Sequence, residues 1–283
     1  EEYARLIQLF QHTNQAFPFE GNRIAVYTEG YTKLQSLLRE LQKAKQHIHI
    51  EYYIFEDDAI GRLVRDVLIE KASQGVEVRV IYDDVGCWHV PNRFFEEMRN
   101  AGIEVRSFLK VRFPLFTSRV NYRNHRKIVV IDGRIGFVGG MNLAERYMRG
   151  FSWGIWRDTH ILIEGKAVHG LQTAFLLDWY FVDRTLITAS RYFPKIESCG
   201  SSLVQVVTSE PIGPWKEIMQ GLTMAINGAK KYFYMQTPYF LPTEQVLAAM
   251  QTAALAGVDV RLMLPERADN RITHFCLLYT SDA

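Results

Sequence analysis

The chain has 283 residues, of which 48% are hydrophobic, 23% charged and 13% aromatic, and its formal net charge is +2. This length allows one large domain or two medium ones, and the aromatic content excludes a disordered chain. The near-balanced charge points to no polyanionic partner, three isolated cysteines disfavour a disulfide scaffold or zinc ribbon, and no apolar run approaches the ~18 residues that span a bilayer.

Helical and strand patterns alternate along the first part of the chain. A helical period at the amino end is followed by a turn-rich loop. The patterns then predict helices at 31–45, 59–74 and 92–100, between strands at 23–28, 47–55, 76–84 and 103–109. Asp57 or Asp58 can cap the second of these helices, and Gly75 can end it. Such strand–helix–strand repetition predicts an α/β domain with a largely parallel sheet.

An internal repeat divides the chain. AKQHIHIEYYIF (Ala44–Phe55) aligns with AKKYFYMQTPYF (Ala229–Phe240) without gaps, at an offset of 185. QGVEVRVIYDD around Gly75 aligns with AGVDVRLMLPE around Gly257, at an offset of 182. Two generic βαβ units could converge on such patterns, but the same short matches in the same order favour a duplication. Tyr52, Tyr53 and Phe55 are expected in the core of the first copy.

Basic residues gather just before the most informative motif. Seven Lys and Arg residues occur between Arg106 and Lys127, without an acid. Such a run is usually a solvated face, but this one leads into His125-Arg126-Lys127 and a short apolar strand. Because alternate residues of a strand share a face, His125 and Lys127 project together.

Polar and small residues follow that strand. An Asp132-Gly133 turn predicts a hairpin, and after it Gly139 and Gly140 leave backbone amides approachable, with the amide donor of Asn142 next. A histidine, a fixed cation and neutral donors suit a phosphate better than a metal, because lysine and asparagine donate protons.

The pattern H-x-K-x4-D-x6-G-[GS]-x-N resembles the signature of the phospholipase D superfamily. The chain is similar over nearly its whole length to bacterial cardiolipin synthases, including the stretches IEYYIFEDDAIG, WRDTH and TPYFLPT. The resemblance implies the phospholipase D fold, a duplicated mixed or parallel sheet flanked by helices. Gly140 stands where many members have Ser, which removes a hydroxyl but leaves the backbone amide.

The resemblance also implies a reaction. His125 would attack the phosphorus of a phosphodiester to form a phosphohistidine, and a second alcohol would then displace it. Asp158 of WRDTH would orient the His125 ring, and Asp132 would hold the strand pair and Lys127 in place. The phosphoryl oxygens would be bound by Lys127, Asn142, Gly139 and Gly140. Neither a metal nor an organic cofactor is required. Trp156 and His160 could be strand residues beside this site.

The resemblance implies two catalytic halves. We expect the first at residues 1–195, the start of the second at 200–275, and a candidate non-native tail at 276–283. The expected protein is a piece of a longer one, without the amino-terminal membrane helices and the second catalytic motif, and therefore of little transferase activity by itself. The implied substrate is an anionic phospholipid, phosphatidylglycerol, at the surface of a bacterial cell membrane, with no nucleic acid as partner.

Three alternatives stay open from the residues. GFSWG (150–154) matches a serine-hydrolase elbow, but a helix-like segment precedes it and a strand-like one follows, which is the wrong order. A hydrolase or nuclease of the same fold would use the basic run along a phosphate backbone. The segment VRFPLF (111–116) argues instead for a bilayer surface, because its apolar residues are interleaved with Arg112. A non-catalytic binding module is the third alternative.

Overall fold

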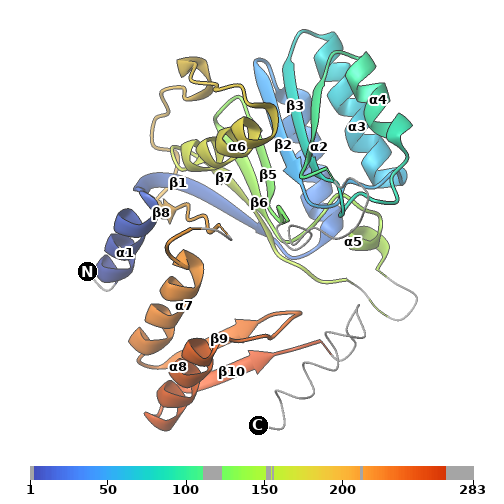
Figure 1. Cartoon of the computed structure of the whole chain (residues 1–283). Helices are drawn as coiled ribbons and strands as arrows, with labels where there is room; N and C mark the ends of the chain where they lie inside the picture. The colour runs from blue at the N-terminus through green and yellow to red at the C-terminus, as the bar shows by residue number, and fades with distance from the viewer. Residues whose placement is uncertain (1–2, 111–122, 151–153, 155, 211–212, 266–283) are drawn as a thin grey trace. The chain divides into compact units, whose positions relative to one another are not determined.

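The computed structural model describes residues 3–110, 123–150, 154, 156–210 and 213–265 (Figure 1). The chain forms two compact units, one of Phe17–Val206 and one that combines Glu1–Ala16 with Val207–Ala283. The helix at the amino end thus belongs to the same unit as the second repeat, and the proposed division at residues 195–200 stays a prediction. The VRFPLF segment, residues 151–153 of GFSWG and the tail 276–283 lie outside the described residues.

The unit Phe17–Val206 contains an eight-stranded sheet in the order β4-β3-β2-β5-β6-β7-β1-β8. Its strands are β1 (Pro18–Tyr27), β2 (His47–Tyr52), β3 (Glu77–Asp83), β4 (Glu104–Phe108), β5 (Lys127–Ile131), β6 (Ile135–Gly139), β7 (His160–Glu164) and β8 (Ser202–Gln205). Its helices are α2 (Gly30–Lys43), α3 (Ala59–Ser73), α4 (Asn92–Asn100), α5 (Arg146–Arg149), α6 (Val168–Asp183) and the 3₁₀ turn η2 (Ser190–Tyr192).

The sheet is mixed rather than largely parallel. Strands β2, β3 and β4 are parallel, as the βαβ pattern predicts, whereas β2 pairs with β5 antiparallel and every later pairing is antiparallel. The hairpin predicted at Asp132-Gly133 joins β5 to β6. In this register Tyr52 lies opposite Lys127, so the H-x-K segment enters the sheet beside the strand of the first repeat.

Helices cover both faces of this sheet. Figure 1 shows α2, α3 and α4 on one side and α6 on the other. The first face buries the larger apolar core, which includes Leu37 of α2, Val64 of α3 and Phe94 of α4. The sequence patterns predicted these three helices. The predicted cap of α3 is present as well, since the Asp58 carboxylate accepts from the amides of Ile60 and Gly61.

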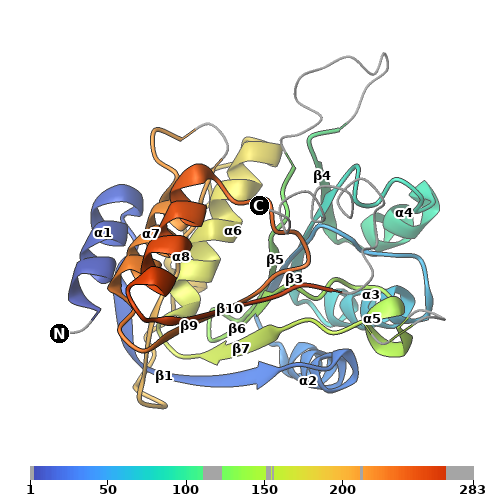
Figure 2. The ribbon, with the colours of Figure 1, turned by 90° about the horizontal axis from the view of Figure 1, so that it is seen from below.

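The second unit contains α1 (Ala4–Asn14), α7 (Glu217–Gly228), α8 (Glu244–Leu255) and the parallel strands β9 (Tyr232–Gln236) and β10 (Asp259–Met263). Helices α7 and α8 pack side by side against these strands, as both views show (Figure 2). The order β9-α8-β10 repeats β2-α3-β3 at the positions that the sequence alignment predicts. Gly75 and Gly257 end the two central helices with φ of 88° and 91°, which glycine adopts readily. Among the described residues no helix is long and apolar enough to cross a bilayer.

Candidate active site

The structure brings His125 and Lys127 into contact where the chain enters β5. The Lys127 Nζ atom lies 2.8 Å from Nδ1 of the His125 ring and donates to the His125 carbonyl oxygen at 2.6 Å. Because an ammonium group can only donate, Nδ1 accepts this hydrogen bond and the neutral ring carries its proton on Nε2. The expected nucleophile and the expected cation therefore form one pair.

Electrostatics give this pair the protonation states that phosphate chemistry needs. The His125 residue is exposed, but partial burial of its ring and, secondly, the charge of Lys127 lower its pKa to about 4. Lys127 is buried, and burial lowers its pKa to about 8, while the charges of Asp158 and Asp83 oppose that shift. At neutral pH the imidazole is therefore neutral and the ammonium charged, as a nucleophile and a phosphate-binding cation require.

Tyr53 adds an aromatic wall that the sequence prediction missed. Tyr52 and Phe55 are fully buried, as expected, but Tyr53 is only partly buried. Its ring contacts that of His125 in a tilted arrangement, with centroids 4.3 Å apart and an angle of 40° between the planes. The Lys127 ammonium lies 5.4 Å from the centroid of the same ring. The prediction of a core role for Tyr53 was wrong. The expected parallel sheet did not place the H-x-K segment beside β2, whereas in the structure β5 pairs with β2 and brings His125 next to Tyr53.

Asp158 lies against the Gly139-Gly140 turn. The amide of Gly140 donates to the carbonyl oxygen of Thr159 at 2.8 Å, and the Asp158 carboxylate occupies the space beside Gly140 where a side chain would begin. The Asp158 carboxylate accepts from the amide of Thr159 at 2.6 Å. Lys127, rather than Asp158, occupies Nδ1 of His125 here, so the orienting role of Asp158 stays a prediction.

The two glycines of this turn should differ in their tolerance of alanine. A Cβ atom on Gly139 would lie 2.5 Å from Cα of His160 and 2.6 Å from the Thr159 carbonyl oxygen, which are backbone atoms. On Gly140 the three nearest atoms all belong to the Asp158 carboxylate, the end of a side chain that can move, with Oδ1 at 2.0 Å. We expect Gly139→Ala to lower the free energy of unfolding by about 1–3 kcal/mol and Gly140→Ala by less than half as much. Urea denaturation measures both, and equal losses would contradict this packing.

Asn142 is held inside the protein rather than presented to solvent. Its Nδ2 donates to the Tyr147 hydroxyl at 2.6 Å, and its Oδ1 accepts from the amide of Ile54 at 3.1 Å. The side chain therefore joins the segment after β2 to α5 and closes one side of the site. Only one of the two N–H groups on Nδ2 is used by Tyr147, so donation from Asn142 to a phosphate needs neither bond to break and stays a prediction.

Asp132 lies at the opposite end of β5 from Lys127. It has a positive φ of 53° in the hairpin turn, and its carboxylate accepts from the amides of Lys45, Gln46 and His47 at 2.8–2.9 Å. These bonds tie the start of β2 to the end of β5 and so fix the register that places Tyr52 beside Lys127. The position supports a structural role and gives no contact with the His125–Lys127 pair.

A buried basic cluster lies on the same face of the sheet as Lys127. Lys33 of α2 is 1% exposed and its Nζ donates to the Tyr52 hydroxyl at 2.9 Å. His160 is fully buried, and neither ring nitrogen has a hydrogen-bond partner among the described residues. Burial, then the charges of Lys33 and Lys127, hold the pKa of His160 well below its ordinary value. His160 is therefore neutral behind the site.

Lys33 should make stability depend on pH. Burial lowers its pKa from 10.5 to about 7, so between these values the unfolded chain holds a proton that the folded chain has lost. Stability should therefore rise with pH from about 7 to 10. We expect Lys33→Met to flatten this rise and to raise the free energy of unfolding at pH 7 by at least about 2 kcal/mol.

The matched control for Lys33 is Lys71, another buried lysine, whose Nζ has two neutral oxygen partners on Gln42 and Gln74. Lys71→Met leaves Lys33 and its buried surroundings in place, so the rise in stability from about pH 7 to 10 should remain. Chemical denaturation at several pH values measures both variants. An unchanged slope in Lys33→Met would show that Lys33 is solvated in the folded protein.

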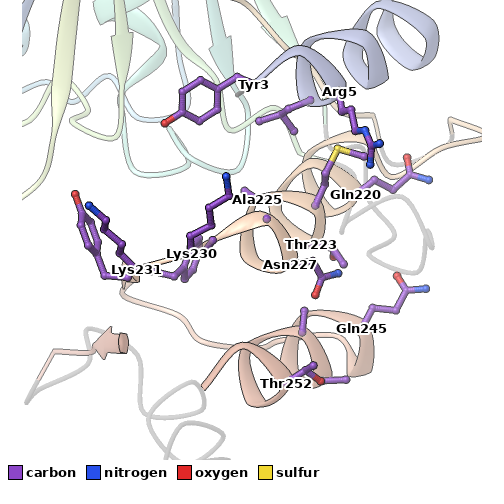
Figure 3. Close-up of a pocket in the computed structure, with 18 residues that line it drawn as sticks. Tyr3, Arg5, Gln220, Thr223, Ala225, Asn227, Lys230, Lys231, Gln245 and Thr252 are labelled. Carbon is purple, nitrogen blue, oxygen red and sulfur yellow. The ribbon is translucent and has the colours of Figure 1, made fainter. Parts of the chain in front are cut away.

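A separate cavity of about 1310 Å³ opens in the second unit, between α1, α7, α8 and the start of β9 (Figure 3). Arg5, Lys230 and Lys231 line it, and its described lining residues include no carboxylate. It shares no residue with the group around His125. Within the described ranges, no group of three or more His, Cys, Asp or Glu side chains is placed to hold a metal ion.

Comparisons with known proteins agree on one family. The family model described as cardiolipin synthase, PLD-like domain, matches residues 37–179 and 222–277. The chain is 44% identical over 258 residues to a cardiolipin synthase of Geobacillus kaustophilus, covering 90% of this chain and 51% of that protein. It is 42% identical over 277 residues to the major cardiolipin synthase ClsA of Bacillus subtilis, covering 96% and 57%. The chain thus spans about half the length of these relatives.

A solved structure supports the fold. The phosphatidylserine synthase of Haemophilus influenzae superposes with a TM-score of 0.66 at 14% identity, covering 98% of this chain and 72% of that one. At this identity the likeness concerns the fold alone. It agrees with the mixed sheet between two layers of helices described above.

Proposed function

Because this chain belongs to the cardiolipin synthase family of PLD-like domains, we propose that it provides a catalytic half of a phosphatidyltransferase that makes cardiolipin from phosphatidylglycerol. The observation that carries the proposal is the contact of 2.8 Å between a neutral His125 ring and the charged Lys127 ammonium. A phosphodiester brought to this pair meets a nucleophile and a cation at once.

The first step forms a covalent intermediate. Oxygens of the phosphodiester draw the Lys127 ammonium away from Nδ1, and the ring proton moves to Nδ1, where Asp158 is the proposed acceptor. The freed Nε2 lone pair forms a bond to phosphorus, and the bond from phosphorus to the glycerol headgroup breaks. Glycerol leaves after gaining a proton, and the phosphatidyl group stays on His125. Lys127 stabilises the negative charge on the phosphoryl oxygens throughout.

The second step reverses the first with another alcohol. The hydroxyl of a second phosphatidylglycerol attacks the phosphorus, loses its proton and releases His125, giving cardiolipin. The family resemblance assigns proton donation to the leaving alcohol to a second motif. General acid catalysis of this kind is worth typically 10²–10⁴-fold. We propose that this reaction takes place at the surface of a bacterial cell membrane, with anionic phospholipid as the partner.

Two substrates separate this proposal from a nuclease of the same fold. Purified protein is incubated with vesicles of phosphatidylglycerol labelled in the phosphate, and in parallel with labelled single-stranded DNA. We expect label from the lipid on the protein and release of glycerol, with no cleavage of DNA. Turnover of DNA alone would overturn the proposal, and release of phosphatidic acid without cardiolipin would make water the acceptor.

A further inference from the structure

A fully buried glutamate lies on the opposite face of the sheet from Lys127. Glu51 of β2 is 1% exposed and points toward α6, where Asp178 is also buried. Its Oε1 accepts from Nδ2 of Asn124, and the same Nδ2 donates to Oδ2 of Asp178 at 3.1 Å. One amide nitrogen is therefore hydrogen-bonded to two carboxyl groups, so these two buried groups lie close together.

Only one of these two carboxyl groups can keep its charge at low cost. Asp178 has an ion pair with Arg126, whereas Glu51 forms no ion pair with any residue in the described part of the chain. Oε2 of Glu51 is buried and has no hydrogen-bond partner among the described residues unless it bears a proton that it can donate. Burial first, and then the charge of Asp178 together with a hydrogen bond to it, raise the pKa of Glu51 well above its ordinary value.

The groups around Glu51 on every packed element agree with a neutral acid. Its neighbours in register are Ile81 of β3 and Ile128 of β5, both apolar. Asp83, at the end of β3, accepts from the backbone amide of Asn124 at 3.4 Å. His49 lies two residues earlier on the same face of β2, but its ring contacts Arg79 and Gln172. Arg126 is the cation that opposes the rise in the pKa of Glu51, and it is paired with Asp178.

This carboxyl pair holds both neighbours of His125 in the chain. Asn124 is bonded to Glu51 and Asp178, and its Oδ1 accepts from the backbone amide of Arg126 at 3.0 Å. The Arg126 guanidinium is paired with Asp178. Both flanking side chains are thus fastened on the α6 side of the sheet, while the side chains of His125 and Lys127 meet on the other side.

We propose that Glu51 is a positioning residue: as a neutral acid that donates to Asp178 and accepts from Asn124, it fixes the backbone of His125 opposite the phosphate. The effect of Glu51 on catalysis rests on the proposed function, whereas its effect on the backbone of His125 does not. A displacement of about 1 Å in a reacting group can cost 10²-fold in rate, so a fixed backbone here matters for the nucleophile.

Two variants of similar size test this role. Glu51→Gln is permanently neutral, and its amide can donate to Asp178 and accept from Asn124 as the protonated acid does. Glu51→Met keeps the volume but makes neither bond. The matched control is Glu217→Gln, at a buried glutamate of the second unit that accepts from Ser209.

The first measurement follows the covalent step. A phosphodiester with a nitrophenolate leaving group is used, because nitrophenolate departs without a general acid. Wild type, Glu51→Gln and Glu217→Gln should form the phosphoenzyme at rates within about twofold of one another, and Glu51→Met about 10²-fold more slowly. A loss in Glu51→Gln as large as in Glu51→Met would show that Glu51 acts as an anion and would overturn the proposal.

The second measurement needs no catalysis. Amide hydrogen exchange in the peptide that contains residues 124–127 should be as slow in Glu51→Gln as in wild type and clearly faster in Glu51→Met. Unchanged protection in Glu51→Met would remove the positioning role, whatever the activity. If wild type exchanges as expected but forms no phosphoenzyme, only the proposed function is lost.

The third measurement tests the proton. A carboxyl with a raised folded pKa contributes stability below its ordinary range and loses it as pH rises through the folded value. The stability of Glu51→Gln relative to wild type should therefore increase with pH above about 5. The infrared carbonyl band of a protonated carboxyl should be present in wild type and Glu217→Gln and absent in Glu51→Gln. A pH-independent difference and an unchanged band would overturn the neutral state.

Discussion

Replacement of His125 by Asn is expected to abolish the covalent phosphoenzyme, with a fall of at least about 10³-fold in the rate of phosphate capture. Asparagine offers no ring nitrogen to phosphorus, and no other histidine in the described residues is hydrogen-bonded to Lys127. Because His125 lies in an exposed position before β5, the variant should fold with unchanged stability. Capture of label from a nitrophenyl phosphodiester measures the effect directly. The control is His89→Asn, at an exposed histidine of the same unit, which should capture label as wild type does.

The pH dependence of the capture rate reports the pKa of His125 and so tests its environment a second way. With the pKa of His125 lowered to about 4, the nucleophile stays neutral well below pH 6.5. The acid limb of the capture rate should therefore lie near pH 4 to 5. An acid limb at the ordinary histidine value, or full capture by His125→Asn, would contradict the assignment of the nucleophile.

Replacement of Lys127 by Met is the second large effect, and we expect it to lower the capture rate by about 10²–10³-fold. Methionine keeps most of the buried volume but removes the ammonium that stabilises the phosphoryl oxygens. Since the charge of Lys127 is the second cause of the low pKa of His125, the acid limb should also move upward in pH. Wild type should lose activity above pH 8, where Lys127 deprotonates, and the variant should lack this limb.

The control for Lys127 is again Lys71→Met, which removes a buried ammonium elsewhere in the same unit. Its capture rate and both limbs should match wild type. If Lys127→Met keeps more than about a third of the rate, phosphate binding must depend on another cation. Measurement of the limbs in both variants separates loss of the cation from general damage to the fold.

Local chain signals were sufficient for the helices and for the repeat. The helix at Asn92–Asn100 and the helix end at Gly75 lie where the patterns predict them. Of the two candidate caps, Asp58 is the one used, and Gly257, the repeat partner of Gly75, also ends a helix. The strand pairing was harder, because a βαβ pattern specifies parallel neighbours but says nothing of a strand that returns antiparallel. Pairing of β2 with β5 joins distant segments, and it is supported by three hydrogen bonds that the amides of residues 45–47 donate to the Asp132 carboxylate.

The candidate site shows the same division. The spacing of His125 and Lys127 implied a shared face, and the two side chains meet. The spacing could not reveal that Tyr53 contacts the His125 ring. Nor could it reveal that Glu51 and Asp178 hold residues 124–126 from the α6 side of the sheet. Those contacts come from Glu51, Tyr53 and Asp178, each of which is more than 50 residues away from His125 in the sequence. Buried polar networks of this kind follow from tertiary packing and leave little local pattern in a sequence.

The central claim is that a ring nitrogen of His125 forms the bond to phosphorus, and one measurement tests it most directly. Protein incubated with phosphatidylglycerol labelled in the phosphate is quenched in base, digested and analysed by mass spectrometry. We predict a phosphatidyl group on the peptide that contains His125, through a phosphorus–nitrogen bond that survives base and is lost in acid. Label on a serine or on another histidine, or its persistence in acid, would contradict the account.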